Sequence, residues 1–326
     1  MKTMTVAVVL VLLCQSCQAQ VENVELGESL AKHRYKGLQV YPVRANDAFL
    51  AKRTKTRYLT LNEAVSTGKV VVTEHREKGR SRNAGIVQSD GGSADVNKLY
   101  IENNSADTVF ILGGEIVQGG KQDRTIARDL VLLPKSGKVD LDVFCVEHGR
   151  WSEVAAEETV NESPDDDRTE FIIEKQSIAP NSVRKAAMNA KSQEKVWEEV
   201  DIALSVNTVE APTRTVNALK MEDTYTKGLT EYSKALSGVF NSDPKVIGVI
   251  AVAGDEIIAC DVFTSHELFM KYYDNLLQSW ASQAMESNGE VSVDKTMVVE
   301  YYDKTVRAKM KEAGFDKRGT LHLTTF

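Results

Sequence analysis

A glycine-rich stretch of the chain carries side chains suited to holding an anion. It reads GGEIVQGGKQDR over residues 113–124, and the donors Lys121, Gln122 and Arg124 follow the glycine pair that begins at Gly119. Glycines let a backbone approach a ligand closely, and an arginine fork matches a carboxylate or a phosphate. The stretch therefore predicts one half of a binding site for a small anionic ligand.

A second stretch, VFCVEHGRW over residues 143–151, is predicted to supply the other half. Arg150 offers another guanidinium, and Trp151 offers a large aromatic face. Roughly twenty residues separate the two stretches, which is enough for one strand out and one strand back. If those strands pair, Arg124 and Arg150 line one rim, where they would bind an anion that carries a flat group.

The same positions also suit a buried network of ion pairs with a structural role. Glu115 and Glu147 carry the charges that would neutralise Lys121, Arg124 and Arg150. Buried charges persist in proteins when they are paired and hydrogen-bonded, and the glycines would then mark a hairpin turn. Both interpretations stay open. A phosphate loop is not expected, because neither serine nor threonine follows the lysine.

Hydrolysis is the second functional hypothesis, and it would use carboxylates or a thiol. Glu115 and Glu147 are candidates for an acid and a base in cleavage of a glycosidic or N-glycosidic bond. Cys145 is a further catalytic candidate, although His148 would point to the opposite face of a strand. His322, near the end of the chain, could reach this site only through folding. A third hypothesis is a non-catalytic envelope or assembly protein.

No metal site and no cofactor are predicted from the residue types and spacings. The five histidines form no ligand cluster, and Asp165–Asp167 lack the spaced ligands and the glycine of a calcium loop. The formal net charge is −7 and no basic block occurs, which argues against nucleic-acid binding. The predicted partner is a small anionic ligand, and the sequence identifies no protein partner.

Residues 1–19 are predicted to be an export signal. The apolar run over residues 6–13 is too short to span a bilayer. Cys17 and Ala19 fit a cleavage site after Ala19, which predicts a periplasmic or secreted protein. The alternative is a lipid anchor on Cys17, although Cys14 stands where a lipoprotein signal normally has an aliphatic residue.

The first half of the chain after this signal is predicted to be rich in strands. Short strand-like runs over residues 20–155 indicate an antiparallel β-sandwich or partial barrel. Thr60 and Glu63 form a capping-box pattern for a short helix that Gly68 would end. The acidic residues 156–175 are predicted to be a loop and a domain boundary.

The second half, residues 176–326, has both helical and strand patterns, so the chain as a whole is predicted to be α+β. A hairpin is expected around Gly254 and Asp255. Cys145 and Cys260 lie in apolar runs, where they would either pair in an oxidising compartment or remain buried thiols. Helices are expected over residues 181–200, 221–240, 265–286 and 303–315, and strands over residues 295–302 and 319–326.

The two central motifs resemble the ARG-and-rhodanese-phosphatase-superfamily-associated domain, in which ARG stands for ADP-ribosylglycohydrolase. The similarity extends to LTLNEAVSTGKVVVTE, DVFTSHELFMKYYDNLL and GTLHLTTF, and so covers most of the chain. It implies a link to nucleotide or ADP-ribose metabolism without implying an activity. The family motif falls on Gly114, Glu115, Gly119, Lys121, Gln122, Arg124, Cys145, Glu147, Gly149, Arg150, Trp151 and His322.

Overall fold

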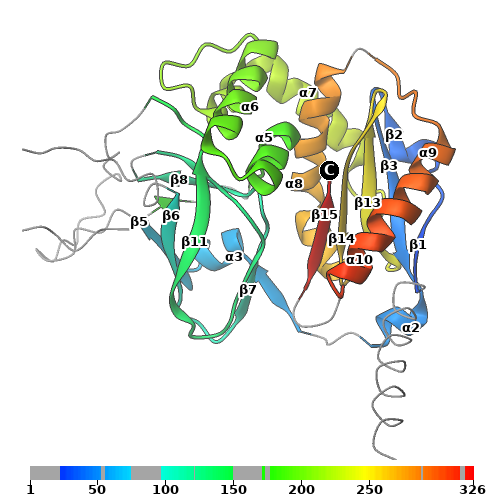
Figure 1. The fold of residues 1–326 in the computed structure, drawn as a ribbon, viewed down its shortest axis with the longest axis horizontal. Helices are drawn as coiled ribbons and strands as arrows, with labels where there is room; N and C mark the ends of the chain where they lie inside the picture. The colour runs from blue at the N-terminus through cyan, green and yellow to red at the C-terminus, as the bar shows by residue number, and fades with distance from the viewer. Residues whose placement is uncertain are drawn as a thin grey trace, which may run out of the picture. The chain divides into compact units, whose positions relative to one another are not determined.

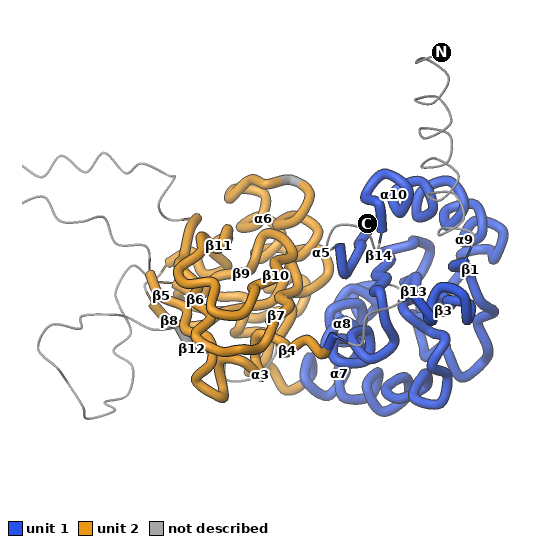
Figure 2. Tube along the Cα trace, turned by 90° about the horizontal axis from the view of Figure 1, so that it is seen from below, with its two compact units in different colours: residues 1–56, 224–326 blue, residues 57–223 orange. Residues whose placement is uncertain are grey.

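The helix and strand signals of the sequence assemble into two units. The structure, a computed structural model, describes residues 23–52, 56–74, 97–120, 122–149, 171–172, 177–287, 289–315 and 320–326. Unit 1 takes its described residues from 1–56 and 224–326, and unit 2 takes them from 57–223 (Figure 2). Each unit combines sheets with helices, which confirms the predicted α+β class.

The capping box predicted at Thr60 is present in unit 2. Thr60 Oγ1 accepts a hydrogen bond from Glu63 N at 3.2 Å, and Glu63 Oε2 accepts one from Thr60 N at 2.8 Å. These contacts satisfy amide groups at the start of helix α3, Leu61–Ser66, that would otherwise lack partners. Gly68 follows with a φ of +65°, a left-handed conformation in which glycine commonly ends a helix.

Two sheets form the framework of unit 2 (Figure 1). The larger has the strand order β12-β8-β9-β11-β6-β5, and the smaller has the order β10-β7-β4. Neighbouring strands are antiparallel except for β4 and β7, which are parallel. The strands are β4 (Tyr58–Thr60), β5 (Val70–Glu74), β6 (Lys98–Asn103), β7 (Thr108–Ile111), β8 (Ile116–Gly119), β9 (Arg124–Ile126), β10 (Leu130–Leu132), β11 (Gly137–Cys145) and β12 (Phe171–Ile172).

One hydrophobic core contains side chains from both of these sheets. Ile101 of β6 and Ile111 of β7 belong to the same buried cluster as Leu61 of α3. The two sheets therefore enclose a common interior, in agreement with the predicted sandwich or partial barrel. Strands β6 and β7 follow each other in the chain but do not pair, because β6 joins β5 and β11 whereas β7 joins β4 and β10.

The helix predicted over residues 181–200 is interrupted in the structure. Helix α5, Asn181–Lys185, continues into a π-helical turn, η2, Ala186–Ala190, and Lys191 then has a φ of +50°. Ser192 begins a new helix, α6, Gln193–Val206, by accepting from Lys195 N at 3.5 Å. A short 3-10 helix, η3, Val216–Met221, completes this part of unit 2.

Strand β13 lies inside the sheet of unit 1, which has the order β1-β3-β13-β14-β15 with β2 paired to β3. All residues of β13 are buried, as expected for a strand that is covered on both faces. Gly254 has a φ of +56° in the turn between β13 and β14, so the predicted hairpin is confirmed. The strands are β1 (Val24–Leu26), β2 (Arg34–Tyr35), β3 (Leu38–Ala45), β13 (Val246–Ala253), β14 (Glu256–Phe263) and β15 (His322–Thr325).

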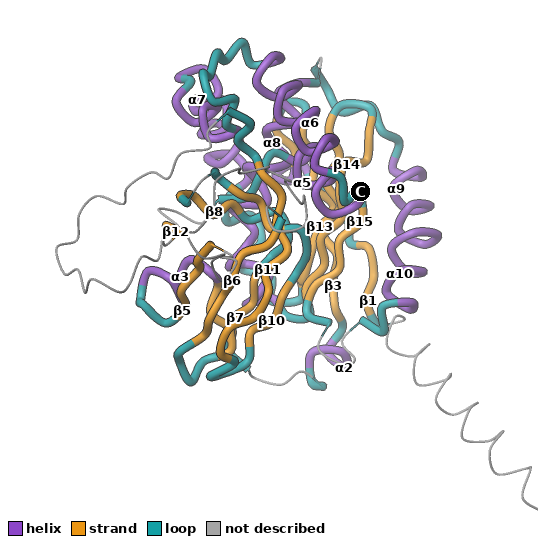
Figure 3. Tube along the Cα trace, turned by 60° about the vertical axis from the view of Figure 1, so that its left-hand side comes forward, coloured by secondary structure: helices purple, strands orange, loops and turns teal. Residues whose placement is uncertain are grey.

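Helices cover both faces of the unit 1 sheet (Figures 1 and 3). Helix α8, His266–Glu286, packs along β13 and β14, and Ser265 caps it by accepting from Leu268 N at 3.2 Å. Helix α9, Lys295–Tyr301, and helix α10, Arg307–Glu312, contribute to the core on the other face. The remaining helical segments of unit 1 are η1 (Ala31–His33), α2 (Asp47–Leu50) and α7 (Asp223–Leu236).

The strand predicted over residues 295–302 is wrong, because these residues are helical. Asp294 caps helix α9, Lys295–Tyr301, by accepting from Thr296 N at 2.6 Å. The helix continues through η4, Tyr302–Val306, into α10, Arg307–Glu312. A buried stripe at helical spacing outweighs the β-propensity of the valines. Its members are Val298, Tyr302, Val306 and Met310.

The two units meet along the chain at residues 56–57 and 223–224, and the predicted boundaries at residues 155 and 176 stay predictions. Strand β3 pairs with β13, so residues near the start of the chain share a sheet with residues of its last third. This long-range pairing has no local signature in the sequence. Unit 2 is consequently an insertion between the two parts of unit 1.

Some predictions fall on residues outside the described ones. The signal over residues 1–19, the lipid-anchor alternative at Cys17 and most of the acidic loop at 156–175 are among them, and they stay predictions. Cys145 and Cys260 are described, and both are free and fully buried. Within the described ranges, no helix combines the length and the apolar character that a membrane span requires.

Candidate functional site

Arg124 projects from the β8–β9–β11 segment of unit 2 toward its interior. It pairs with Val117 of β8 on one side and with Cys145 of β11 on the other. Directly paired residues of neighbouring strands project to the same face of a sheet. Val117 and Cys145 are fully buried, and Val117 belongs to the core of unit 2. The Arg124 side chain is therefore on the core face of the sheet.

The guanidinium of Arg124 is buried without a carboxylate partner among the described residues. The residue is only 2% exposed. Nη1 donates to the carbonyl oxygen of Gln122 at 2.7 Å and lies 3.5 Å from its side-chain Oε1. Nε is also buried, and no atom of the described residues accepts from it. A cation that meets only neutral oxygens has not regained the hydration energy lost on burial.

Gln122 places a second donor beside this guanidinium. Its side chain is fully buried, and its Oε1 takes the position that faces Arg124 Nη1. The amide nitrogen Nε2 is at the other end of the same amide, and within the described part of the chain it meets no acceptor. Gln122 Nε2 and Arg124 Nε are thus two buried donors on side chains that contact each other.

Asp123 fixes the turn from which Gln122 projects. Its Oδ1 accepts from Gly119 N at 3.2 Å, and its Oδ2 accepts from Asn217 Nδ2 at 2.7 Å. Glu147 Oε2 in turn accepts from Asp123 N at 3.1 Å. Gly119 has a φ of +118°, which glycine adopts without the steric cost that other residues incur. Gly119 therefore shapes the turn, and Glu147 supports it from a position two residues beyond the end of β11.

The second glycine of the motif, Gly114, makes room for a buried arginine. Gly114 has a φ of +95°, and a Cβ at this position would lie 2.5 Å from Cγ of Arg184. Arg184 is fully buried, and its Nε donates to the carbonyl oxygen of Gly113 at 3.0 Å. Glu115 follows and accepts from Leu112 N at 2.7 Å. The GGE part of the motif therefore packs α5 against the sheet.

Glu115 and Glu147 contact the chain at different points, one within β9 and one just before it. The carbonyl oxygen of Glu115 accepts from Ile126 N at 2.9 Å, whereas the carboxylate of Glu147 accepts from Asp123 N. Three residues of extended chain separate these contact points by roughly 10 Å. Both side chains are buried, and each carboxylate holds a backbone amide. A joint acid–base role for the pair stays a prediction.

Cys145 is buried beside Arg124, and its pKa is raised. Burial is the largest cause, the carboxylates of Glu74 and Glu147 act in the same direction, and Arg124 opposes them. A raised pKa leaves little of the thiolate that nucleophilic attack requires. Gln193 binds the backbone of Cys145 through both ends of its amide, each at 2.8 Å. These contacts are typical of a core residue, and the nucleophile role stays a prediction.

His322 belongs to unit 1 and has partners there. It is buried on β15, where its Nε2 lies 2.9 Å from Asp261 Oδ1 and its ring centre lies 4.4 Å from that of Phe263. Within the described ranges, no group of three or more His, Cys, Asp or Glu side chains is placed to hold a metal ion. Three further predicted ligand residues lie outside the described residues: Lys121, Arg150 and Trp151.

Sequence reasoning missed three side chains that hold the backbone of the two motifs in place. Asp123 had a local signal, because an aspartate after a glycine pair often binds nearby turn amides. Arg184 and Gln193 had none, because each reaches its partners from a helix far along the chain. Only tertiary packing brings them to Gly113 and Cys145.

The family comparison covers both units. Residues 24–323 match the family of the ARG and Rhodanese-Phosphatase-superfamily-associated Protein domain. The match includes Arg124, Gln122 and every contact described around them. No curated protein and no solved structure matches the chain.

Proposed function

We propose that this chain, which belongs to the ARG and Rhodanese-Phosphatase-superfamily-associated Protein domain family, binds a small anionic ligand through Arg124 and Gln122. One observation carries the proposal. The guanidinium of Arg124 is 2% exposed, and its hydrogen bonds within the described residues reach only neutral oxygens of Gln122. The family match itself implies no ligand and no reaction, so the proposal rests on this geometry.

A permanent cation in this position needs an anion. Arginine stays protonated in proteins, and burying an ion without a counter-charge costs several kcal/mol even after relaxation. An oxyanion at Arg124 Nε would form a charge-assisted hydrogen bond, which is about twice as strong as a neutral one. Gln122 Nε2 would donate to a second oxygen of the same group. A group with at least two acceptor oxygens, such as a carboxylate or phosphate, fits both donors.

The proposed group could be a free ion or the charged end of a larger molecule. Inorganic phosphate, the phosphates of a nucleotide or ADP-ribose, and the carboxylate of a sugar acid share the required chemistry. These ligands differ in the part that extends beyond the charged group. Comparing them therefore separates recognition of the anion from recognition of its carrier.

Calorimetric titration with inorganic phosphate, ADP-ribose and glucuronate tests the proposal directly. At least one of them should bind saturably and raise the melting temperature, since a ligand that binds only the folded state stabilises it. Arg124→Gln should weaken that binding by about tenfold or more, because it removes a charge-assisted hydrogen bond. Arg124→Lys keeps the charge but loses the fork, so its affinity should fall between the two.

Arg128→Gln is the matched control for these variants. Arg128 follows β9 directly, its side chain is 71% exposed, and it pairs with Asp142 at 2.9 Å. Its loss should leave anion binding unchanged. If no anion binds, and Arg124→Gln instead lowers the free energy of unfolding by about 3–5 kcal/mol, Arg124 belongs to a structural ion-pair network and the proposal is wrong.

A further inference from the structure

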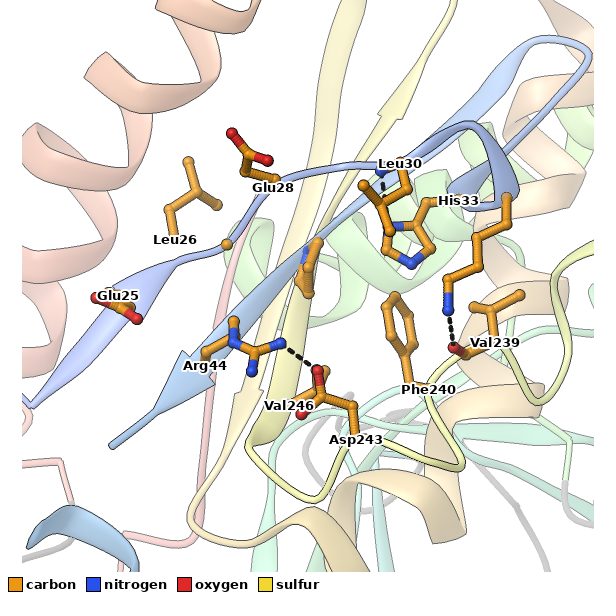
Figure 4. A pocket seen from close by; sticks show the side chains of 13 residues that line it. Glu25, Leu26, Glu28, Leu30, His33, Arg44, Val239, Phe240, Asp243 and Val246 are labelled. Atoms are coloured by element: carbon orange, nitrogen blue, oxygen red, sulfur yellow. Dashed lines mark hydrogen bonds and ion pairs between the residues drawn. The ribbon is translucent and has the colours of Figure 1, made fainter. Parts of the chain in front are cut away.

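Unit 1 contains a pocket of its own (Figure 4). The cavity measures about 420 Å³, within the range of small-molecule sites. Three segments line it: β1 with the loop and η1 that follow it, the second half of β3, and the loop after α7 with the first residue of β13. All three belong to unit 1. Neither the Arg124 site nor the family match assigns a role to this pocket.

Acidic side chains lie on one side of the pocket. Glu25 of β1 and Glu28 of the following loop stand on the same side as Leu26 in Figure 4. Glu28 lies 3.7 Å from Lys295, and both side chains are largely exposed, so this pair is weak. Glu25 is paired across the sheet with Arg44, but among the described residues it forms no ion pair.

A neutral donor lies on the other side of the pocket. His33 is 4% exposed, and its Nδ1 accepts from Leu30 N at 3.1 Å. The proton of the neutral ring must then be on Nε2, for which the described residues offer no acceptor. Burial, and to a lesser extent the charge of Lys32, lowers the pKa of His33 and keeps it neutral, although Asp243 acts in the opposite direction.

Positive charge is available next to this histidine. Lys32 is exposed, and its Nζ donates to the carbonyl oxygen of Val239 at 3.3 Å, on the His33 side of the pocket. Between the two sides, Arg44 Nη1 pairs with a carboxylate oxygen of Asp243. The other guanidinium nitrogens of Arg44 have no partner in the described part of the chain. They can therefore reach a ligand without breaking that pair.

Apolar surface lies between the charged groups. The ring of Phe240 packs against His33 with their centres 4.9 Å apart, and Val246 lies beside it. Leu30, which is 51% exposed, adds a further apolar side chain to the lining. A ligand in this pocket would bury an apolar part against these side chains.

We propose that the pocket binds an amino acid with an apolar side chain, which it holds by both charged ends. The ammonium would lie at Glu25 and Glu28, the carboxylate at His33, Lys32 and Arg44, and the side chain against Phe240. Glu25 and Glu28 on one side would repel a simple anion, and Lys32 on the other would repel a simple cation. A zwitterion satisfies both sides.

Leucine and its two singly capped derivatives test this proposal. L-leucine should bind saturably in a calorimetric or NMR titration, whereas N-acetyl-leucine lacks the ammonium and leucinamide lacks the carboxylate. Each capped compound should bind about tenfold more weakly or worse, because one charged contact is lost. Equal affinity for all three compounds, or no saturable binding of leucine up to about 10 mM, would overturn the proposal.

Two exposed variants assign the ends of the ligand without threatening the fold. Glu28→Gln should reduce the preference for leucine over N-acetyl-leucine, and Lys32→Met should reduce the preference for leucine over leucinamide. Glu256→Gln and Lys309→Met are the matched controls, because both positions are exposed and neither lines the pocket. If the controls change the preferences as much as the test variants do, binding occurs elsewhere and the assignment is wrong.

Discussion

Gly114 shows at the scale of one residue how the glycine-rich motif depends on packing. Two requirements meet at this position: the backbone has a φ of +95°, and the side chain of Arg184 fills the space that a Cβ would need. Arg184 could not lie here and donate to Gly113 if any side chain stood at Gly114. A glycine whose place in the motif suggested the close approach of a ligand is thus needed for internal packing.

Gly114→Ala should lower the free energy of unfolding by about 2–4 kcal/mol, because backbone strain and overpacking add. Gly137→Ala is the control, since Gly137 also has a positive φ, +65°, but a Cβ placed there would have no neighbour within 4 Å. The control should lose only about 1–2 kcal/mol, the cost of the backbone conformation. Urea unfolding measures the free energy of unfolding of both variants. Equal losses would show that the Arg184 side chain moves aside at little cost.

At the scale of the element, local signals predicted best where a few neighbouring residues fix the backbone conformation by themselves. The capping box at Thr60 and the turn at Gly254 are such cases, and both are present. The segment over residues 295–302 is the opposite case, because its valines favour a strand locally. Its buried stripe extends into α10, so only a window longer than the apparent strand reveals the helical period.

Part of the candidate site was likewise predictable from local sequence, and part of it was not. The sequence identified Arg124 and Gln122 as donors, because their types and their place after glycines are visible locally. It could not show that Arg124 would be buried without a carboxylate partner among the described residues, since burial depends on the pairing with β8 and β11. Nor could it assign Gly114 to the packing of Arg184, which comes from a distant helix.

Thr60→Ala should lower the free energy of unfolding by about 1 kcal/mol, the usual value of an N-cap. The loss arises because Glu63 N would no longer meet the threonine hydroxyl. Ser66→Ala, in the last turn of the same helix, is the control and should have little effect, because its hydroxyl contact is exposed. If chemical denaturation shows that both variants lose the same free energy of unfolding, the cap contributes no more to stability than the exposed contact of Ser66.

At the scale of the whole molecule, unit 2 draws both of its sheets and its core from residues 57–223. A fragment of these residues should therefore fold alone, with dispersed amide NMR signals and one cooperative unfolding transition. Residues 224–326 alone should not fold, because β13 would lack its partner β3. A disordered 57–223 fragment would show that unit 2 needs the rest of the chain.

The insertion of unit 2 has a consequence for synthesis on the ribosome. Strand β3 emerges early, but β13 follows about 200 residues later, which takes about 10–40 s at ordinary elongation rates. During that interval the β13-facing edge of β3 has unpaired backbone groups and apolar side chains beside it. Unit 2 can fold in the meantime, whereas the nascent start of unit 1 is the segment most in need of a chaperone.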